Sequence, residues 1–131
     1  MTETNFLTDD READDAAKEA VLTKATLRAA SHLGLSNRVL GKILGLSEAT
    51  VSRLRSGARK IEHDHKSFEV AALFVRFYRG LDAIVGSDDT IASKWLANHN
   101  VALGNRPINM IQSLPGLMTV IQYVDARRAI I

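Results

Sequence analysis

The residues best suited to chemistry are hydroxyl and guanidinium groups gathered in one short segment, residues 47–55. Ser47 and Thr50 stand three apart, and Arg53 follows after three more, so a helix would turn all of them toward one side. Serine and threonine donate hydrogen bonds to phosphates or base edges, and arginine pairs with guanine through two donors. These groups predict a contact with the major groove of DNA.

Two short helices are needed to position these groups, and the sequence predicts them over residues 37–44 and 48–56. Ser36 and Ser47 are natural N-caps, and a glycine follows each helix, where it suits the C-terminus. Two helices joined by a tight turn form the helix-turn-helix layout. Five apolar residues are spaced to pack this pair inward: Leu40, Ile43, Leu44, Val51 and Leu54.

The outward side of this unit supplies the candidate DNA-binding residues. Ala49 is small enough to let the second helix lie deep in the groove or touch a thymine methyl. Glu48 repels phosphate but can accept from cytosine, so we expect either a cytosine contact or weak binding. A unit kept only for packing is the alternative interpretation. The full set is Ser36, Asn37, Arg38, Lys42, Ser47, Glu48, Ala49, Thr50, Ser52, Arg53, Arg55 and Lys60.

Charge is distributed unevenly along the 131 residues, although the net charge is only +2. Residues 1–19 hold seven acids against two bases, and residues 20–60 hold eight bases against Glu48 alone. The rest of the chain holds seven of each sign. The basic block in the middle is typical of a protein with a polyanionic partner, and a solvated basic surface is the alternative.

The segment GLSEATVSRLRSG, which follows LGKIL, resembles the recognition segment of the Xre family of helix-turn-helix regulators. The resemblance covers roughly residues 20–60. It departs from the family at Glu48 and Ala49, where many relatives carry glutamine. The resemblance implies sequence-specific binding to operator DNA.

The chain around this unit is predicted to be all-α. Residues 1–14 are acidic and are expected to be flexible, and an amphipathic helix is expected from near Asp15 to Gly34. Residues 15–66 would then form the helix-turn-helix DNA-binding domain, and residues 67–131 a small helical domain.

Residues 68–85 are apolar on more than one face, so a helix there must be covered on more than one side. In so small a protein we expect a subunit contact, and therefore a homodimer. A central helix covered within one chain is an equally good interpretation. The candidate dimerisation residues are Phe68, Phe74, Val75, Phe77 and Leu81.

A second set of motifs follows: a helix led by Trp95, then LGNRP at residues 103–107 and LPG at residues 114–116, before a last helix from about Leu117. Together they resemble the toxin-binding domain of the Xre, MbcA and ParS antitoxins, over roughly residues 68–131. Asn105 stands where that family has a second glycine. The resemblance implies a type II antitoxin that neutralises a RES-type toxin, whose relatives degrade NAD, and that represses its own operon.

The residues that this resemblance offers to the toxin lie in the loop stiffened by Pro107 and at the end of the chain. Two adjacent arginines on a tail that the core does not need favour a contact with the toxin, at its active-site mouth. A helix C-terminus would also suit two arginines. The full set is Asn105, Arg106, Met110, Tyr123, Arg127, Arg128, Ile130 and Ile131.

Other chemistry finds little support in the sequence. The chain lacks cysteine, a phosphate-binding glycine loop, and any GxSxG or HExxH motif, so we expect no enzyme, no catalytic residue and no cofactor. His63, Asp64 and His65 alternate in a polar loop and make weak metal ligands, so no metal is expected. The acidic start and the absence of long apolar runs predict a cytoplasmic protein with no membrane contact.

Two other functions stay open on the sequence alone. The chain can be a stand-alone Xre-family transcriptional repressor, whose C-terminal half only dimerises or senses a ligand. It can also be an interaction module that has lost DNA binding.

Overall fold

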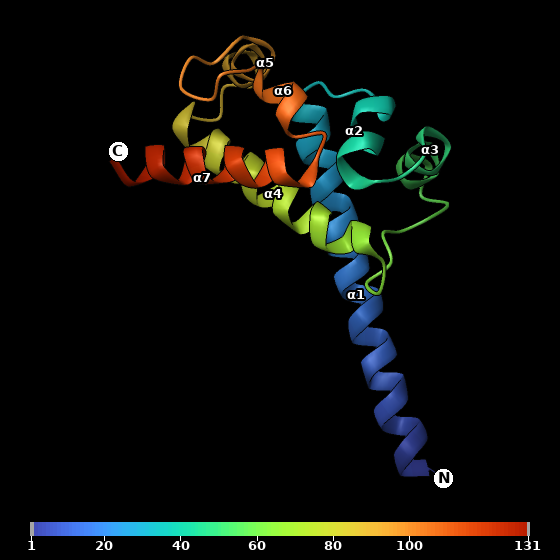
Figure 1. Cartoon of the computed structure of the whole chain (residues 1–131). Coiled ribbons are helices and arrows are strands. Elements are labelled where there is room, and N and C mark those ends of the chain that lie inside the picture. Colours follow the sequence, from blue (N-terminus) through green and yellow to red (C-terminus); the bar gives the residue numbers. More distant parts are fainter. Residues whose placement is uncertain (1, 131) are drawn as a thin grey trace.

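The computed structural model describes the backbone of residues 2–130 and the side chains of residues 9–129 (Figure 1). The predicted all-α fold is confirmed, because the described residues form helices and no strand beyond an isolated bridge between Asn100 and Asn105. None of these helices is long and apolar enough to cross a membrane. In chain order they are α1 (Thr2–His32), α2 (Asn37–Leu44), α3 (Glu48–Ser56), α4 (Lys66–Ile84), α5 (Asp89–Ala97), α6 (Pro107–Met110) and α7 (Leu114–Ile130).

Helix α1 begins far earlier than predicted. The acidic segment that we expected to be flexible is helical from Thr2, and Figure 1 shows this half of α1 projecting beyond the body of the molecule. The prediction was wrong about the helix start because it relied on large apolar residues, whereas a helix also forms on propensity. Alanine-rich sequence around residues 13–20, acids near the positive N-terminal end and an Asp14–Lys18 pair at 3.1 Å all favour the helix.

Helix α4 is central to the core and packs against both α7 and α1. Its residues Phe74, Phe77 and Leu81 are almost completely buried within the single chain. The prediction that these three residues form a subunit contact is therefore wrong, and coverage within one chain explains this face. On the other face of the helix, Val75 is also buried, whereas Phe68 remains half-buried.

Two glycines bring the C-terminal helices close together. A Cβ added at Gly80 would lie 2.7 Å from Val124 Cγ1, so the glycine allows α4 and α7 to approach closely. A Cβ at Gly116 would lie 2.0 Å from the Met110 carbonyl oxygen, so Gly116 lets α7 start directly against the end of α6. Helix α7 consequently begins at Leu114, three residues before the predicted start.

Candidate nucleic-acid and partner interfaces

The predicted caps of the helix-turn-helix are present. The Ser36 hydroxyl oxygen accepts a hydrogen bond from the Val39 backbone N–H at 3.2 Å, and Ser47 accepts from Thr50 at 3.1 Å. Gly45 and Gly57 end the two helices in the left-handed conformation, with φ of 71° and 82°. Each helix is therefore started and stopped by its own local sequence.

The core of this unit also follows the prediction. The five apolar residues that we expected to face inward, Leu40, Ile43, Leu44, Val51 and Leu54, are all buried. Gly41 fixes the distance between α2 and the turn, because a Cβ there would lie 2.6 Å from the Leu46 carbonyl oxygen. This packing holds α3 rigidly with one side toward solvent.

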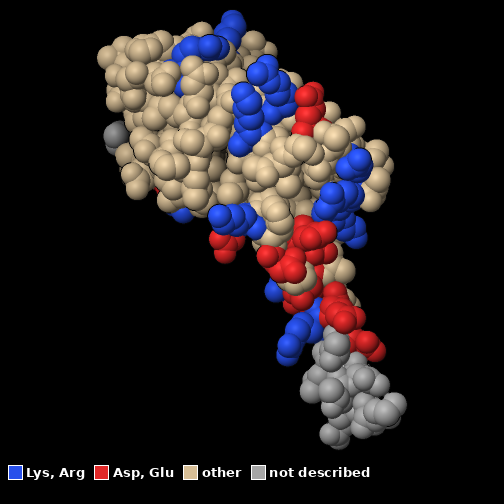
Figure 2. Space-filling view, turned by 45° about the vertical axis from the view of Figure 1, so that its right-hand side comes forward, with Lys and Arg blue, Asp and Glu red and all other residues tan. Residues whose placement is uncertain are grey.

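The outward side of α3 carries groups that can bind DNA. Glu48, Ala49, Ser52 and Arg53 are exposed, and Thr50 is half-buried with its hydroxyl held 2.9 Å from that of Ser47. Arg38 and Lys42 are exposed on α2, and Lys60 on the loop after α3. Figure 2 shows lysine and arginine on this side of the molecule, with acids gathered on the projecting part of α1.

Arg55 differs from the other predicted DNA-binding residues, because its guanidinium bonds within the chain. Its Nε donates to the Asn37 side-chain oxygen, and its terminal nitrogens donate to the Leu35 carbonyl at 3.3 Å and the Ser31 hydroxyl at 3.5 Å. Arg55 and Asn37 thus tie the end of α3 to the α1–α2 connection. The spacing along α3 gave no signal for this long-range contact.

The loop after α3 is fastened to α1. The buried Ile61 donates its backbone N–H to the Thr23 hydroxyl at 2.9 Å. The Glu19 carboxylate accepts from the backbone N–H of His63 at 2.9 Å and lies 2.8 Å from its Nδ1. The loop and its exposed Lys60 are therefore held beside α3 by contacts that the sequence did not predict.

These contacts shift the pKa values of both partners. The hydrogen bond from the His63 backbone N–H lowers the pKa of Glu19, and the hydrogen bond from the His63 ring lowers it further. The hydrogen bond to Glu19 raises the pKa of His63, and Asp15 at 3.5 Å adds to the effect. His63 is thus held by carboxylates, and His65 caps α4 by accepting from the Ser67 N–H at 3.1 Å. No group of three metal-binding side chains occurs within the described residues.

The loop before α6 is shaped by polar side chains. Asn100 accepts the Leu103 N–H at 3.0 Å, and Asn105 accepts the Arg106 N–H at 2.7 Å. Arg106 Nε donates to the Ala97 carbonyl oxygen at the end of α5. Asn105 and Arg106 are both exposed, so they can contact a partner while they also hold the loop.

A stack of aromatic rings connects α4, α5 and α7. Trp95 lies 6.3 Å from Phe77 on one side and 6.3 Å from Tyr123 on the other, between ring centroids. The Arg127 guanidinium lies 5.9 Å from the Tyr123 ring centroid, within the range of a cation–π contact. Trp95 and Tyr123 are half-buried, and Arg127 is exposed at the outer end of the stack.

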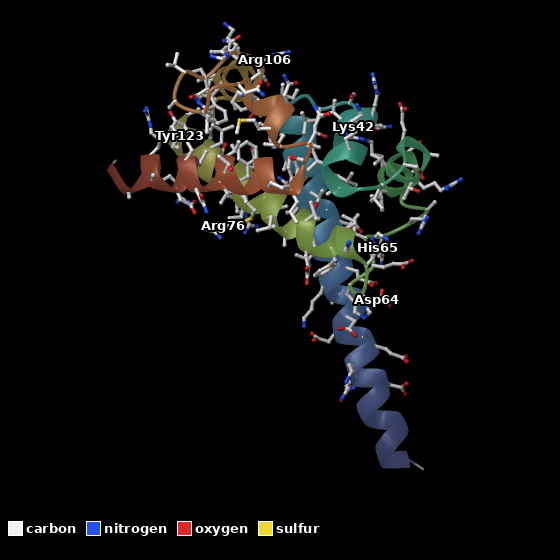
Figure 3. The ribbon with its side chains drawn as sticks, in the orientation of Figure 1. Lys42, Asp64, His65, Arg76, Arg106 and Tyr123 are labelled. Carbon is white, nitrogen blue, oxygen red and sulfur yellow. The ribbon has the colours of Figure 1, made fainter. Side chains whose placement is uncertain are left out.

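The structure places the predicted toxin-binding residues on more than one surface. In Figure 3, Arg106 and Tyr123 lie on the side of the molecule opposite α3. Arg128 instead lines a groove between α1 and α4, so the two adjacent arginines serve different surfaces. Met110 is half-buried beside Gly116. The side chains of Ile130 and Ile131 lie outside the described residues.

One exposed residue near this surface was missed. Val101 lies in the loop before α6 and is 89% exposed. The sequence carries no clear signal for it, because Ala102 and Leu103 follow Val101 and only the fold shows which of these apolar residues are exposed.

The fold and the exposed α3 define a helix-turn-helix DNA-binding protein with an added helical domain. Residues 12–76 match the antitoxin Xre-like helix-turn-helix domain, and residues 80–129 match the antitoxin Xre/MbcA/ParS C-terminal toxin-binding domain. The chain belongs to the Xre/MbcA/ParS antitoxins of toxin–antitoxin systems. No curated protein matches the chain.

Proposed function

We propose that this antitoxin neutralises a RES-type, NAD-degrading toxin and represses its own operon as a homodimer. The observation that carries the proposal is the separation of two exposed surfaces on one rigid chain. The outward side of α3 faces away from the surface around Tyr123 and Arg106 (Figure 3). One molecule can therefore hold operator DNA and a toxin together.

The proposed DNA-binding surface consists of exposed residues on α3. Arg53 is exposed, and no hydrogen bond ties its side chain within the described residues, unlike Arg55 two residues later. Ala49 and Ser52 on the same helix are small and exposed, which suits close approach to base edges. A homodimer would present two such helices to two half-sites, about 34–36 Å apart in this class.

The toxin surface rests on Asn105, Arg106, Tyr123 and Arg127. The Tyr123–Arg127 contact holds a guanidinium at the edge of the molecule, where it can pair with a carboxylate of the toxin through two donors. The resemblance to antitoxins of RES-type toxins supports the same partner.

Co-expression with the adjacent gene tests the proposal. We expect a growth-arresting protein to co-purify with the chain, cellular NAD to fall when that protein is made alone, and NAD to recover when both are made. Arg127→Glu should weaken neutralisation and leave operator binding intact. Arg53→Ala is the matched control, because it should weaken operator binding alone. A chain that binds its operator but captures no toxic partner would instead be a stand-alone repressor.

A further inference from the structure

The groove between α1 and α4 has no role in the two surfaces described above. Its volume is about 630 Å³. Val21 of α1 lies in it as a residue that is 70% exposed, and Ala25, Phe68 and Val75 add further apolar lining. A valine so exposed beside other apolar side chains is a feature of interaction surfaces. This α1–α4 groove is therefore a candidate docking site.

The rim of the α1–α4 groove is basic. Lys18, Arg76, Arg79 and Arg128 line it from three helices. Arg76 pairs with Asp125, but Arg79 and Arg128 take part in none of the ion pairs among the described side chains. An apolar floor with cations along its edge is complementary to a helix that is apolar at one point and acidic beyond it.

Helix α1 of the same protein has this pattern. Asp14 and Asp10 precede Val21 by seven and eleven residues, which places them on the same face of the helix, and both are exposed. Arg28 follows Val21 by seven residues and is exposed on that face as well. The acidic half projects beyond the body, so a second molecule can reach it (Figure 1).

We propose that the α1–α4 groove is filled by α1 of a second copy of the chain, with the two α1 helices antiparallel and crossing at Val21. A two-fold axis through this point places Asp14 of each protomer beside Arg28 of its partner, because both lie seven residues from Val21. Ala17 and Ala25 also lie symmetrically about Val21, and their small side chains allow close approach. The exposed Asp14–Lys18 pair is weak and gives way at little cost.

This inference refines the homodimer of the proposed function and gives the projecting part of α1 a role. The surface around Tyr123 stays open in such a dimer, because it lies on α5 and α7 rather than on the groove side of α1. Toxin neutralisation and dimerisation are therefore separate properties that can be lost independently.

The test uses light scattering of the full chain across a dilution series. Val21→Asp places an unpaired charge at the centre of the contact, and we expect the dimer dissociation constant to rise by roughly a hundredfold or more. Val101→Asp is the matched control, since Val101 is even more exposed than Val21 but does not line the groove and lies outside α1 and α4. Circular dichroism would verify that both variants keep their helices.

Charge reversal gives a second measurement that does not depend on the apolar contact. Asp14→Arg and Arg28→Asp should each weaken the dimer, and the double variant should restore it. A monomeric wild-type chain at all concentrations, or a Val21→Asp variant that dimerises normally, would overturn the proposal. So would loss of toxin capture by Val21→Asp from a monomeric antitoxin, because the groove would then serve the toxin. Neutralisation measured by growth separates failure of the dimer from failure of the antitoxin function.

Discussion

The helix-turn-helix and the toxin-binding half are built in different ways. In α2 and α3 the shape comes from neighbours in sequence: serine caps three residues from their partners, glycines directly after each helix, and apolar residues at helical spacing. In the C-terminal half the shape comes from distant contacts, such as Arg106 on the Ala97 carbonyl and Trp95 against Tyr123. A surface of the first kind can be derived from spacing, and a surface of the second kind requires the fold.

The largest loss of stability should come from substituting the two glycines that allow close backbone contacts, one in each half of the chain. In Gly116→Ala the new Cβ would lie 2.0 Å from the Met110 carbonyl oxygen, and backbone must move to relieve the clash. We expect the free energy of unfolding to fall by about 3 kcal/mol or more, with loss of toxin binding. Urea unfolding followed by circular dichroism would measure this loss.

Gly41→Ala is the corresponding change in the helix-turn-helix, where the Cβ would lie 2.6 Å from the Leu46 carbonyl oxygen. The gentler clash predicts a smaller loss of stability, about 1–3 kcal/mol, together with weaker operator binding. Gly45→Ala is not a suitable control, because Gly45 has a positive φ and would add backbone strain. Equal stability of Gly116→Ala and the wild type would contradict the tight α6–α7 junction.

The next effect separates two arginines that the sequence treats alike. Arg53→Ala should cost about 1–3 kcal/mol of specific DNA binding if it reads a base, with the free energy of unfolding unchanged. Arg55→Ala should lower the free energy of unfolding by about 1–2 kcal/mol, because it removes the bonds to Asn37, Ser31 and Leu35. Thermal melts and operator titrations on both variants measure the two quantities.

Arg55→Lys sharpens the distinction, since lysine keeps the charge but cannot form the same fork of hydrogen bonds. We expect it to behave like Arg55→Ala in stability. If Arg55→Lys kept full stability and DNA affinity while Arg55→Ala lost only affinity, Arg55 would contact DNA, as the sequence analysis predicted.

These arginines show why part of the site could be predicted and part could not. The caps, the buried residues of α2 and α3, and the exposure of Arg53 follow from contacts within four residues, so the sequence predicted them. Arg55 bonds to residues 18 to 24 positions away, and no local pattern contains that distance. The same reason explains why the sequence did not place Arg128 in the α1–α4 groove.

The prediction of where α1 begins was wrong for a different reason. The prediction treated the near absence of large apolar residues after Leu7 as a sign of flexibility, because such a segment buries no core. The structure has a helix there that projects from the body, and its described side chains from residue 9 to residue 14 are exposed. Helical propensity, rather than burial, was the signal to use, and it was present in the alanines and in the absence of glycine and proline.

The smallest effect is a pH dependence in the loop that joins the two halves. The pKa of His63 is raised by its hydrogen bond to Glu19, so the pair stabilises the fold while His63 is protonated and loses this contribution as pH rises through the raised pKa. The pKa of Glu19 is lowered by hydrogen bonds from His63, so the contribution is also lost when pH falls through that lowered value. Stability from this pair is therefore greatest between the two pKa values.

A His63→Ala variant should show a flatter dependence of the urea midpoint on pH around the ordinary histidine value of about 6.5. Because the pair is partly exposed to solvent, the difference should be small, and NMR titration of the His63 ring is the more sensitive measurement. A midpoint for His63 at or below that ordinary value would contradict the contact between the His63 ring and Glu19, and the loop beside α3 would then be held by the backbone hydrogen bonds of Ile61 and His63.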